Sequence, residues 1–285
     1  MIMCANSFFP DNPADIDQAR IVIVPVPYDM TSTWVKGADK APQAIIEASE
    51  HLEGYDIETC TEPWKHGIAT DKPIIETSDP ESMVNAVENR IKHHLVNNRF
   101  SVVIGGEHSV SIGSVRAHSK VYDDLTVLQL DAHADFRDTY HGSRYNHACV
   151  MARISEFCKV VQVGIRSMDI CEMQGMDKDR LFLAKDCISG IKWIDRVIEK
   201  LSDQVYITID LDVFDPAVMP STGTPEPGGL FWYDVLALLK AVCEKRNVRG
   251  FDVVELCPNP KVKAPDFLAA KLIYQLLALK FISSH

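Results

Sequence analysis

The stretch LTVLQLDAHAD, residues 125–135, indicates the fold and raises the question of function. It begins as a short apolar run of the kind that forms a buried strand, and it ends with Asp131, His133 and Asp135 at alternate positions. Alternate residues of an extended chain point to the same side, so we expect these three side chains to share one face. Because buried strands normally avoid charge, metal-type ligands at this spacing predict a functional site where the strand ends.

Similar short runs, rich in Val and Ile, alternate with amphipathic stretches along almost the whole chain. Strands that are apolar on both faces are typical of a parallel sheet covered by helices on both sides. We find no internal repeat, linker or low-complexity segment, so the sequence predicts one α/β domain over residues 1–285. The expected strands cover 20–28, 101–108, 125–133, 159–167, 180–186, 204–215 and 248–258; the expected helices cover 41–52, 80–98, a segment from about 109, 190–202, 231–245 and 265–281.

The composition argues against several classes of protein. A net charge of -11 argues against a nucleic-acid partner and fits a cationic small substrate, although solubility alone explains most of this charge. No apolar run approaches the length of a membrane helix, and residues 1–20 lack the basic start and apolar stretch of a signal peptide. The eight cysteines include no C-x-x-C pair and are expected to be free thiols in a reducing cytoplasm.

Three further strand ends carry unusual residues. The segment IGGEHS contains His108, IDLDVFDP contains Asp210 and Asp212, and FDVVELCP contains Glu255. In parallel α/β folds such residues gather at the carboxyl ends of the strands. Carboxylate and imidazole ligands without thiolate suit Mn²⁺ or a similar ion, and six of them fit two ions that share carboxylates. Each segment alone could be structural, and we interpret Asp215, which precedes a proline, as a turn former.

Taken together, GGEHS, DAHAD and DLDVFDP resemble the motifs of the ureohydrolase family, which includes arginase, agmatinase and formiminoglutamase. TGTPEPGGL (222–230) and FDVVELCP resemble later motifs of the family, and NHACVMARI and VGIRS resemble the bacterial and archaeal agmatinase branch. The resemblance covers residues 25–260, nearly the whole chain. It implies a three-layer α/β/α sandwich around a central parallel sheet, assembled as a homotrimer or homohexamer.

The resemblance also implies a binuclear metal centre. Two Mn²⁺ ions are expected, although Ni²⁺, Co²⁺ or Fe²⁺ would accept the same ligands. Asp131 and Asp210 would bridge the two ions. One ion would be held by His108, Asp131, Asp135 and Asp210, and the other by His133, Asp131, Asp210 and Asp212.

The reaction implied by the resemblance is hydrolysis of a guanidino C–N bond with release of urea. Asp135 would accept a hydrogen bond from the attacking hydroxide and pass its proton to the leaving amine. Glu255 would pair with the guanidinium, because a carboxylate matches its planar fork of donors. His147 would carry protons between the solvent and the site, and His141 is its rival for that role.

Agmatine, hydrolysed to putrescine and urea, is the expected substrate. Thr222 and Thr224 are expected to shape the pocket through hydrogen bonds to the substrate or to its glutamate partner. Arg137 departs from the animal arginase pattern, which disfavours arginase without excluding it, and its role stays open together with those of Trp34 and Glu226. Arginine, guanidinobutyrate and guanidine are alternatives within the family. A non-catalytic regulator that binds guanidino ligands is the alternative from another class.

Overall fold

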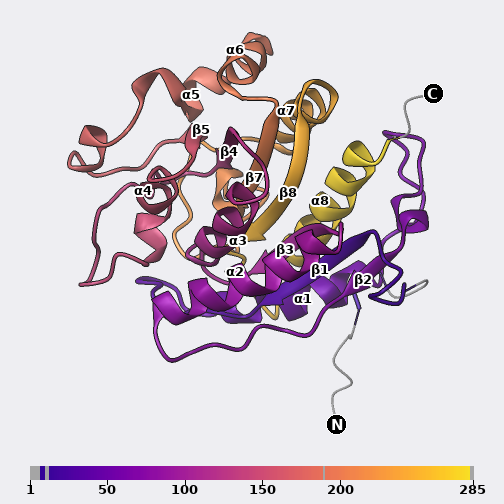
Figure 1. Ribbon diagram of the computed structural model, residues 1–285. Helices are drawn as coiled ribbons and strands as arrows, with labels where there is room; N and C mark the ends of the chain where they lie inside the picture. Colours follow the sequence, from indigo (N-terminus) through magenta and orange to yellow (C-terminus); the bar gives the residue numbers. More distant parts are fainter. Residues whose placement is uncertain (1–6, 10–12, 189, 283–285) are drawn as a thin grey trace.

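One parallel sheet forms the centre of the computed structural model, which describes residues 7–9, 13–188 and 190–282, so that Cys4 lies outside the described residues. Its strand order is β2-β1-β3-β8-β7-β4-β5-β6 (Figure 1). The apolar runs predict seven of these strands, and β2 was missed because it is only three residues long at the edge of the sheet. The strands are β1 Ile21–Val26, β2 Ile68–Thr70, β3 Phe100–Gly105, β4 Leu125–Leu130, β5 Lys159–Ile165, β6 Leu181–Leu183, β7 Gln204–Asp210 and β8 Asn247–Val254.

Helices cover both faces of this sheet, as the sequence predicts. The helices α1 (Ala41–Ser49), α6 (Lys192–Lys200), α7 (Trp232–Lys245) and α8 (Ala264–Lys280) pack on one face, with the short α5 (Ala184–Cys187). The helices α2 (Pro80–Val96), α3 (Val110–Ser119) and α4 (Val150–Ile154) pack on the other. The 3-10 helices are η1 Ala38–Lys40, η2 Pro63–His66, η3 His147–Cys149, η4 Glu172–Gln174, η5 Lys178–Arg180 and η6 Leu211–Val213.

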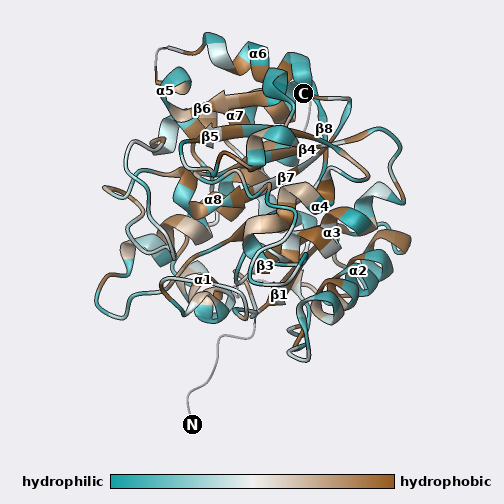
Figure 2. Ribbon diagram, turned by 90° about the vertical axis from the view of Figure 1, so that its left-hand side faces the viewer, coloured by the Kyte–Doolittle hydropathy of each residue, from teal (hydrophilic) through white to brown (hydrophobic). Residues whose placement is uncertain are grey.

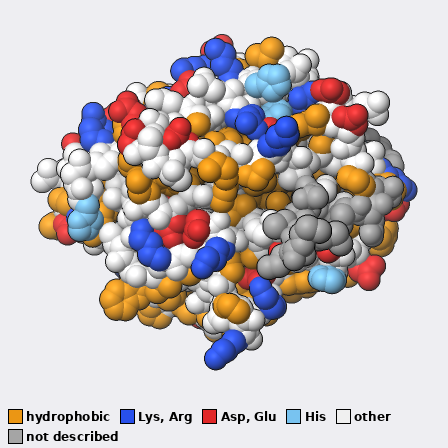
Figure 3. Space-filling model, turned by 90° about the horizontal axis from the view of Figure 1, so that it is seen from below, with side chains coloured by type: hydrophobic (Ala, Val, Ile, Leu, Met, Phe, Trp, Pro, Cys, Tyr) orange, Lys and Arg blue, Asp and Glu red, His pale blue; other side chains and the backbone are white. Residues whose placement is uncertain are grey.

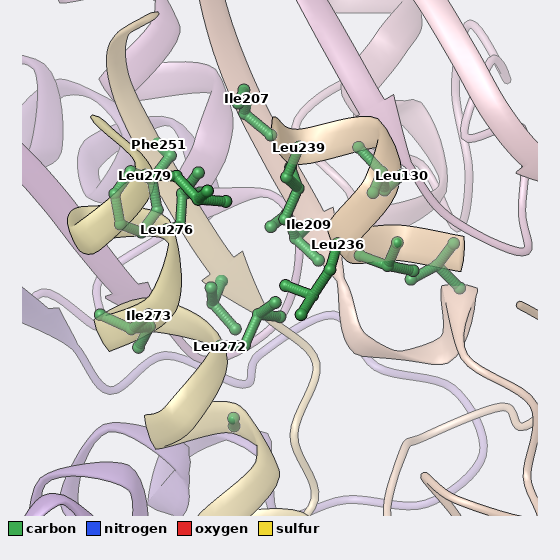
Figure 4. Packing of buried hydrophobic residues seen from close by; sticks show 14 of the residues in the cluster. Leu130, Ile207, Ile209, Leu236, Leu239, Phe251, Leu272, Ile273, Leu276 and Leu279 are labelled. Carbon is green, nitrogen blue, oxygen red and sulfur yellow. The ribbon is translucent and has the colours of Figure 1, made fainter. Parts of the chain in front are cut away.

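The alternation of side chains along the strands divides the interior into two cores. Along β1, Ile21 and Ile23 join the core beneath α7 and α8, whereas Val22 and Val24 join the core beneath α2 and α3. Figure 2 shows the result, with hydrophobic strands inside and hydrophilic helix surfaces outside. Figure 4 shows apolar side chains of α7 and α8 packed against β7 and β8. Burial of this apolar surface is the main force that stabilises the three layers, so the predicted α/β/α architecture is confirmed.

The four central strands, β3, β8, β7 and β4, end at the same level. Their register pairs Leu130 with Ile209, Ile209 with Val253, and Val253 with Ile104. These four residues therefore lie side by side, and the residues that follow them form one common edge of the sheet. All four motifs found in the sequence leave the sheet at this edge, which is where open α/β sheets bind ligands.

All seven expected strands end earlier than the sequence suggests, and two of them show the reason. The strand expected over 125–133 ends at Leu130, and the one expected over 204–215 ends at Asp210, where η6 begins. The reason is local hydrogen bonding. Asp131 Oδ1 accepts the backbone N–H of His133 at 2.6 Å, and Asp210 Oδ1 accepts that of Asp212 at 2.9 Å. These side-chain bonds replace the sheet ladder with turns.

Two general expectations concern membrane helices and thiols, and the structure adds an observation on the surface. Within the described residues, no helix combines the length and apolarity needed to cross a membrane. The seven cysteines in the described part of the chain are free thiols. On the face seen from below, basic and acidic side chains are interspersed with apolar ones (Figure 3).

Candidate active site

His108 lies at the centre of a buried cluster of carboxylates. Its Nδ1 is 3.1 Å from Asp131 Oδ2, 3.0 Å from Asp135 Oδ2 and 3.5 Å from Asp210 Oδ2. This nitrogen is buried and has no hydrogen-bond partner of its own among the described residues. A buried nitrogen that faces three carboxylates is suited to a cation placed between them.

A second group adjoins the first and shares Asp131 with it. His133 Nδ1 lies 2.8 Å from Asp212 Oδ2 and 3.8 Å from Asp131 Oδ1. Each of the two groups brings together at least three side chains able to hold a metal ion. Oxygen and imidazole donors without thiolate fit Mn²⁺ or a similar divalent ion.

Alternation along an extended strand was the wrong explanation for the convergence of these side chains. Asp131, His133 and Asp135 all follow the end of β4, and Asp135 adopts a left-handed backbone with φ 51°. Asp212 lies in η6 rather than in an extended strand, and its Oδ1 accepts the N–H of Ala132 at 3.0 Å. Tight turns at neighbouring strand ends therefore aim the ligands inward.

The charges of the cluster favour the binding of cations. Burial, followed by the neighbouring Asp212 and Asp135, raises the pKa of Asp131 to about 7. Burial alone would lower the pKa of His108, yet the carboxylates of Asp131 and Asp135 beside its ring raise it well above the usual value. Burial would likewise raise the pKa of Asp212, but His133 beside it lowers that pKa to about 2. Carboxylates crowded in a buried place stabilise positive charge, which divalent ions would supply.

A second layer of residues holds His108. Its Nε2 lies 2.9 Å from Thr208 Oγ1, and the Thr208 hydroxyl donates to Asp252 Oδ1 at 2.6 Å. Tyr206 also donates to this carboxylate, at 2.8 Å. A hydroxyl has a single hydrogen, so Thr208 can only accept from His108, whose Nε2 must then carry the hydrogen. The other ring nitrogen is left free to face the cluster, as metal-binding histidines require.

A cavity of about 290 Å³ opens over the cluster. Asp135, Asp210, His133 and Glu255 line its inner part, and the loop that contains Trp34 lines part of the remaining wall. The inner end of the cavity is therefore strongly acidic. A small cationic ligand would enter with its positive charge towards this end.

Glu255 is held in place by its backbone and by the segment that contains His108. It has φ 67°, an uncommon conformation for a residue of this type, and its Oε1 accepts the N–H of His108 at 2.7 Å. Burial, followed by the charge of Glu107, raises the pKa of Glu255 well above the usual value. Backbone strain of this kind is typical of functional sites.

The structure brings only one of the two candidate proton carriers to the cavity. His147 begins η3 after Asn146, whose Oδ1 accepts the N–H of Ala148 at 3.0 Å, and its ring lines the cavity. Burial lowers the pKa of His147. His141 instead is exposed on the loop, with its ring 4.3 Å from that of Tyr140.

Sequence reasoning missed two residues beside His147. The Thr31 hydroxyl donates to Glu107 Oε2 at 2.6 Å and lies 3.1 Å from His147 Nδ1. Glu107 is fully buried, and burial raises its pKa to about 7. The available signal was a glutamate within an otherwise uncharged glycine-rich strand end. Nothing in the sequence showed that Thr31, far away in the chain, would meet it.

The loop after η6 gives a mixed result for the expected pocket residues. Thr222 Oγ1 is buried without a hydrogen-bond partner among the described residues, Glu255 included, so its expected hydrogen bond to the substrate stays a prediction. Thr224 lines the cavity. Glu226 Oε1 lies 3.9 Å from His133 Nε2, which places this glutamate at the edge of the cluster.

Asp215 and Arg166 fix the backbone of that loop. Asp215 accepts the N–H groups of Ala217, Gly228 and Gly229, which confirms it as a turn former. Arg166 donates to the carbonyl oxygens of Glu226 at 2.9 Å and Pro227 at 3.1 Å in the loop, and to that of Asp212 in η6 at 2.6 Å. The loop is thereby tied to the metal-type ligands rather than left free.

A parallel α/β sheet whose carboxyl edge carries two adjoining His/Asp groups is the architecture expected of a metal-dependent hydrolase. The family model described as the arginase family matches residues 19–278, and the chain belongs to this family. The resemblance inferred from the motifs is thus confirmed.

Relatives and solved structures agree with this assignment. The chain is 38% identical to an N(1)-aminopropylagmatine ureohydrolase of Synechocystis sp., over 91% of this chain and 88% of the relative. It is 32% identical to an agmatinase of Pyrococcus horikoshii, over 93% of each chain. The crystal structure of the agmatine ureohydrolase of Thermoplasma volcanium matches with a TM-score of 0.86 and 32% identity, over 95% of this chain and 93% of that one.

Proposed function

We propose that the protein hydrolyses the guanidino group of agmatine to urea and putrescine. The observation that carries this proposal is the acidic inner end of the cavity, where Glu255 lines the same cavity as Asp135 and His133 of the two metal-type groups. The family relationship supports the ureohydrolase class, and the cavity supports a cationic guanidino substrate.

The two His/Asp groups would hold two Mn²⁺ ions, with Ni²⁺, Co²⁺ or Fe²⁺ as alternatives. When bound, these ions would supply a water-derived nucleophile at neutral pH. As the family resemblance implies, Asp131 and Asp210 would be the carboxylates shared by the two ions, and Asp131 belongs to both His/Asp groups. The remaining ligands are His108 and Asp135 on one side and His133 and Asp212 on the other.

Glu255 is the proposed partner of the substrate guanidinium. One of its oxygens is engaged by the His108 N–H, while the side chain lines the cavity. A guanidinium beside it would supply the positive charge that favours the ionised carboxylate. Its planar donors match a carboxylate in two parallel hydrogen bonds. Glu255 would therefore bind and orient the group that reacts, and Thr224 would complete that wall of the pocket.

Asp135 and His147 are the proposed proton carriers. Asp135 lies between the cluster and the cavity, so it can accept a proton from the attacking water and deliver it to the leaving amine. His147 lines the same cavity and is only partly exposed, so it can exchange protons between the site and the solvent.

Two further carboxylates in the cavity wall support an amine-bearing substrate over one that bears a carboxylate. Glu172 and Asp169 line the cavity, as does Arg137. Both oxygens of Glu172 are used by backbone N–H groups, whereas Asp169 pairs at 3.4 Å with Arg137. Asp169 could exchange this partner for a substrate ammonium. N1-aminopropylagmatine is the second candidate, since a 38% identical relative is named for it and it also carries amines beyond the guanidino group.

The direct test is urea release by the Mn²⁺-loaded protein from agmatine, N1-aminopropylagmatine, arginine, 4-guanidinobutyrate and guanidine. The highest kcat/KM is expected for agmatine, and the Glu255→Gln variant, which keeps the shape of the side chain, should lose it. A preference for the aminopropyl compound would select the second candidate. Absence of urea with every compound and metal would favour the non-catalytic regulator.

We also propose a cellular compartment and an oligomeric state for the protein. Free thiols in the described residues support a reducing compartment such as the cytoplasm. A homotrimer or homohexamer is proposed from the family resemblance. Light scattering on the purified protein would distinguish these two assemblies from a monomer.

A further inference from the structure

Thr31 and Glu107 form a chain of hydrogen bonds behind His147. The Thr31 hydroxyl oxygen lies 2.6 Å from Glu107 Oε2, and it accepts the backbone N–H of His147 at 3.0 Å. The same oxygen lies 3.1 Å from the ring nitrogen Nδ1 of His147. The second oxygen of Glu107 accepts the Ser109 hydroxyl at 2.8 Å. Both carboxylate oxygens therefore act as acceptors. Glu107 and Ser109 are buried, whereas Thr31 and His147 are partly exposed.

The number of available hydrogens determines the direction of this chain. A threonine hydroxyl has one hydrogen, and here it goes to the carboxylate of Glu107. The oxygen of Thr31 can then only accept from His147, so the hydrogen of the neutral imidazole must be on Nδ1. The other ring nitrogen, Nε2, is left without a hydrogen.

We propose that Thr31 and Glu107 are positioning residues that hold His147 in the Nδ1–H tautomer, with the bare Nε2 available to the reaction cavity. A neutral histidine in water prefers the opposite tautomer, so this arrangement must be imposed by the protein. The role rests on the proposed function, in which His147 carries protons. A bare Nε2 can accept a proton from solvent and then deliver it within the cavity, whereas an Nε2–H could not accept one.

The structure contains an independent instance of the same arrangement. Behind His108, the hydroxyl of Thr208 gives its hydrogen to the buried Asp252 and accepts from the imidazole. There the ring is connected through Nε2, and Nδ1 is the free nitrogen. In both places a threonine hydroxyl lies between a histidine and a buried carboxylate. The nitrogen without a hydrogen is Nδ1 in His108 and Nε2 in His147, and the two histidines have different roles.

Neutron diffraction from deuterated crystals of the Mn²⁺-loaded enzyme at pH 8.5 tests the proposal without using activity. We expect a deuteron on His147 Nδ1 and none on Nε2. A deuteron on Nε2, with or without one on Nδ1, would overturn the assignment. This readout remains valid if the protein releases no urea, so failure of the proposed function and failure of the tautomer assignment are distinguishable.

Two substitutions supply the kinetic test. Thr31→Val keeps the shape of the side chain but removes the hydroxyl, and we expect kcat to fall about 10-fold to 100-fold, the usual effect of losing a second-layer partner. The KM and the metal content should stay the same, because Thr31 contacts neither the proposed guanidinium partner nor a ligand in the cluster. Thr31→Ser keeps the hydroxyl and should restore most of kcat. An unchanged kcat in Thr31→Val, or an equal loss in both variants, would contradict the proposal.

Discussion

The two histidines that sit in front of a threonine occupy very different parts of the molecule. His108 follows a central strand, its side chain is 1% exposed, and Thr208 behind it belongs to β7. His147 begins the short 3-10 helix η3, its side chain is 20% exposed, and Thr31 behind it belongs to a loop. The hydrogen-bonding device is the same, but one copy is built into the sheet and the other into the cavity wall.

This difference separates two chemical tasks. A metal ligand must keep one nitrogen permanently free and fixed, which a strand end inside the core provides. A proton carrier must reach both the site and the solvent, which a partly exposed position outside the sheet provides. The part of the site around His108, which follows the central strands, is the sheet half, and it is expected to control metal binding. The part around His147 and Thr31 is the loop half, and it is expected to control proton movement.

The largest expected effect is at the sheet half. Asp210→Asn keeps the size of the side chain but removes a charge from the proposed bridging position. Because the remaining cluster would then attract divalent ions less strongly, we expect loss of one or both metal ions and of urea release to background. Metal content by mass spectrometry and urea formation would be measured together. A fully metal-loaded and active Asp210→Asn protein would end the assignment of Asp210 as a bridge.

The sequence indicated the sheet half better than the loop half. The apolar runs predicted the central strands, and the metal-type residues directly follow those runs, so strand order and register bring them to one edge of the sheet. Thr31 and Glu107 meet through loop conformations that no periodicity encodes. Likewise, the left-handed backbone of Asp135 and Glu255 depends on packing around each residue. Local pattern therefore identified the ligands, while the residues that orient the proton carrier required the tertiary structure.

A further histidine, His118, is fully buried and shows what happens without a carboxylate behind the ring. Its ring packs 4.8 Å from that of Tyr206, and its Nδ1 lies 2.8 Å from the carbonyl oxygen of Ser114. Burial lowers the pKa of His118 to about 4. The unfolded chain takes up this proton near pH 6.5 and the folded chain only near pH 4, so acid favours unfolding.

We therefore expect the free energy of unfolding to fall by roughly 3 kcal/mol between pH 6.5 and 4 through His118 alone. The contribution is fully present above pH 6.5 and is lost as the pH falls. In the His118→Asn variant, this part of the pH dependence of the free energy of unfolding should disappear, whether or not the variant is less stable at neutral pH. Denaturant unfolding across this pH range would measure it, with His51→Asn, at an exposed position, as the control. Equal slopes in all three proteins would contradict the expectation.

The comparison itself is tested most directly by making one substitution in both places. Thr208→Val removes the hydroxyl behind His108, and we expect metal affinity to fall about 10-fold to 100-fold because the ligand loses its second-layer partner. Thr31→Val should leave metal affinity unchanged. Titration with Mn²⁺ followed by calorimetry would give both dissociation constants. If the two variants lost metal affinity equally, the division of tasks between sheet and loop would be wrong.

The smallest expected effect is in the cavity wall, where Arg137 pairs with Asp169. Both side chains are partly exposed, and such pairs contribute about 0.2–1 kcal/mol. In Arg137→Gln the freed Asp169 should bind the ammonium of agmatine better, so KM for agmatine should fall by a factor of about two to five. Asp169→Asn should raise it by a similar factor and should lower KM for 4-guanidinobutyrate. Arg144→Gln, which breaks an exposed ion pair with Glu156, is the matched control. An effect of the same size in Arg144→Gln would show that KM reports the net charge of the protein rather than recognition by Asp169.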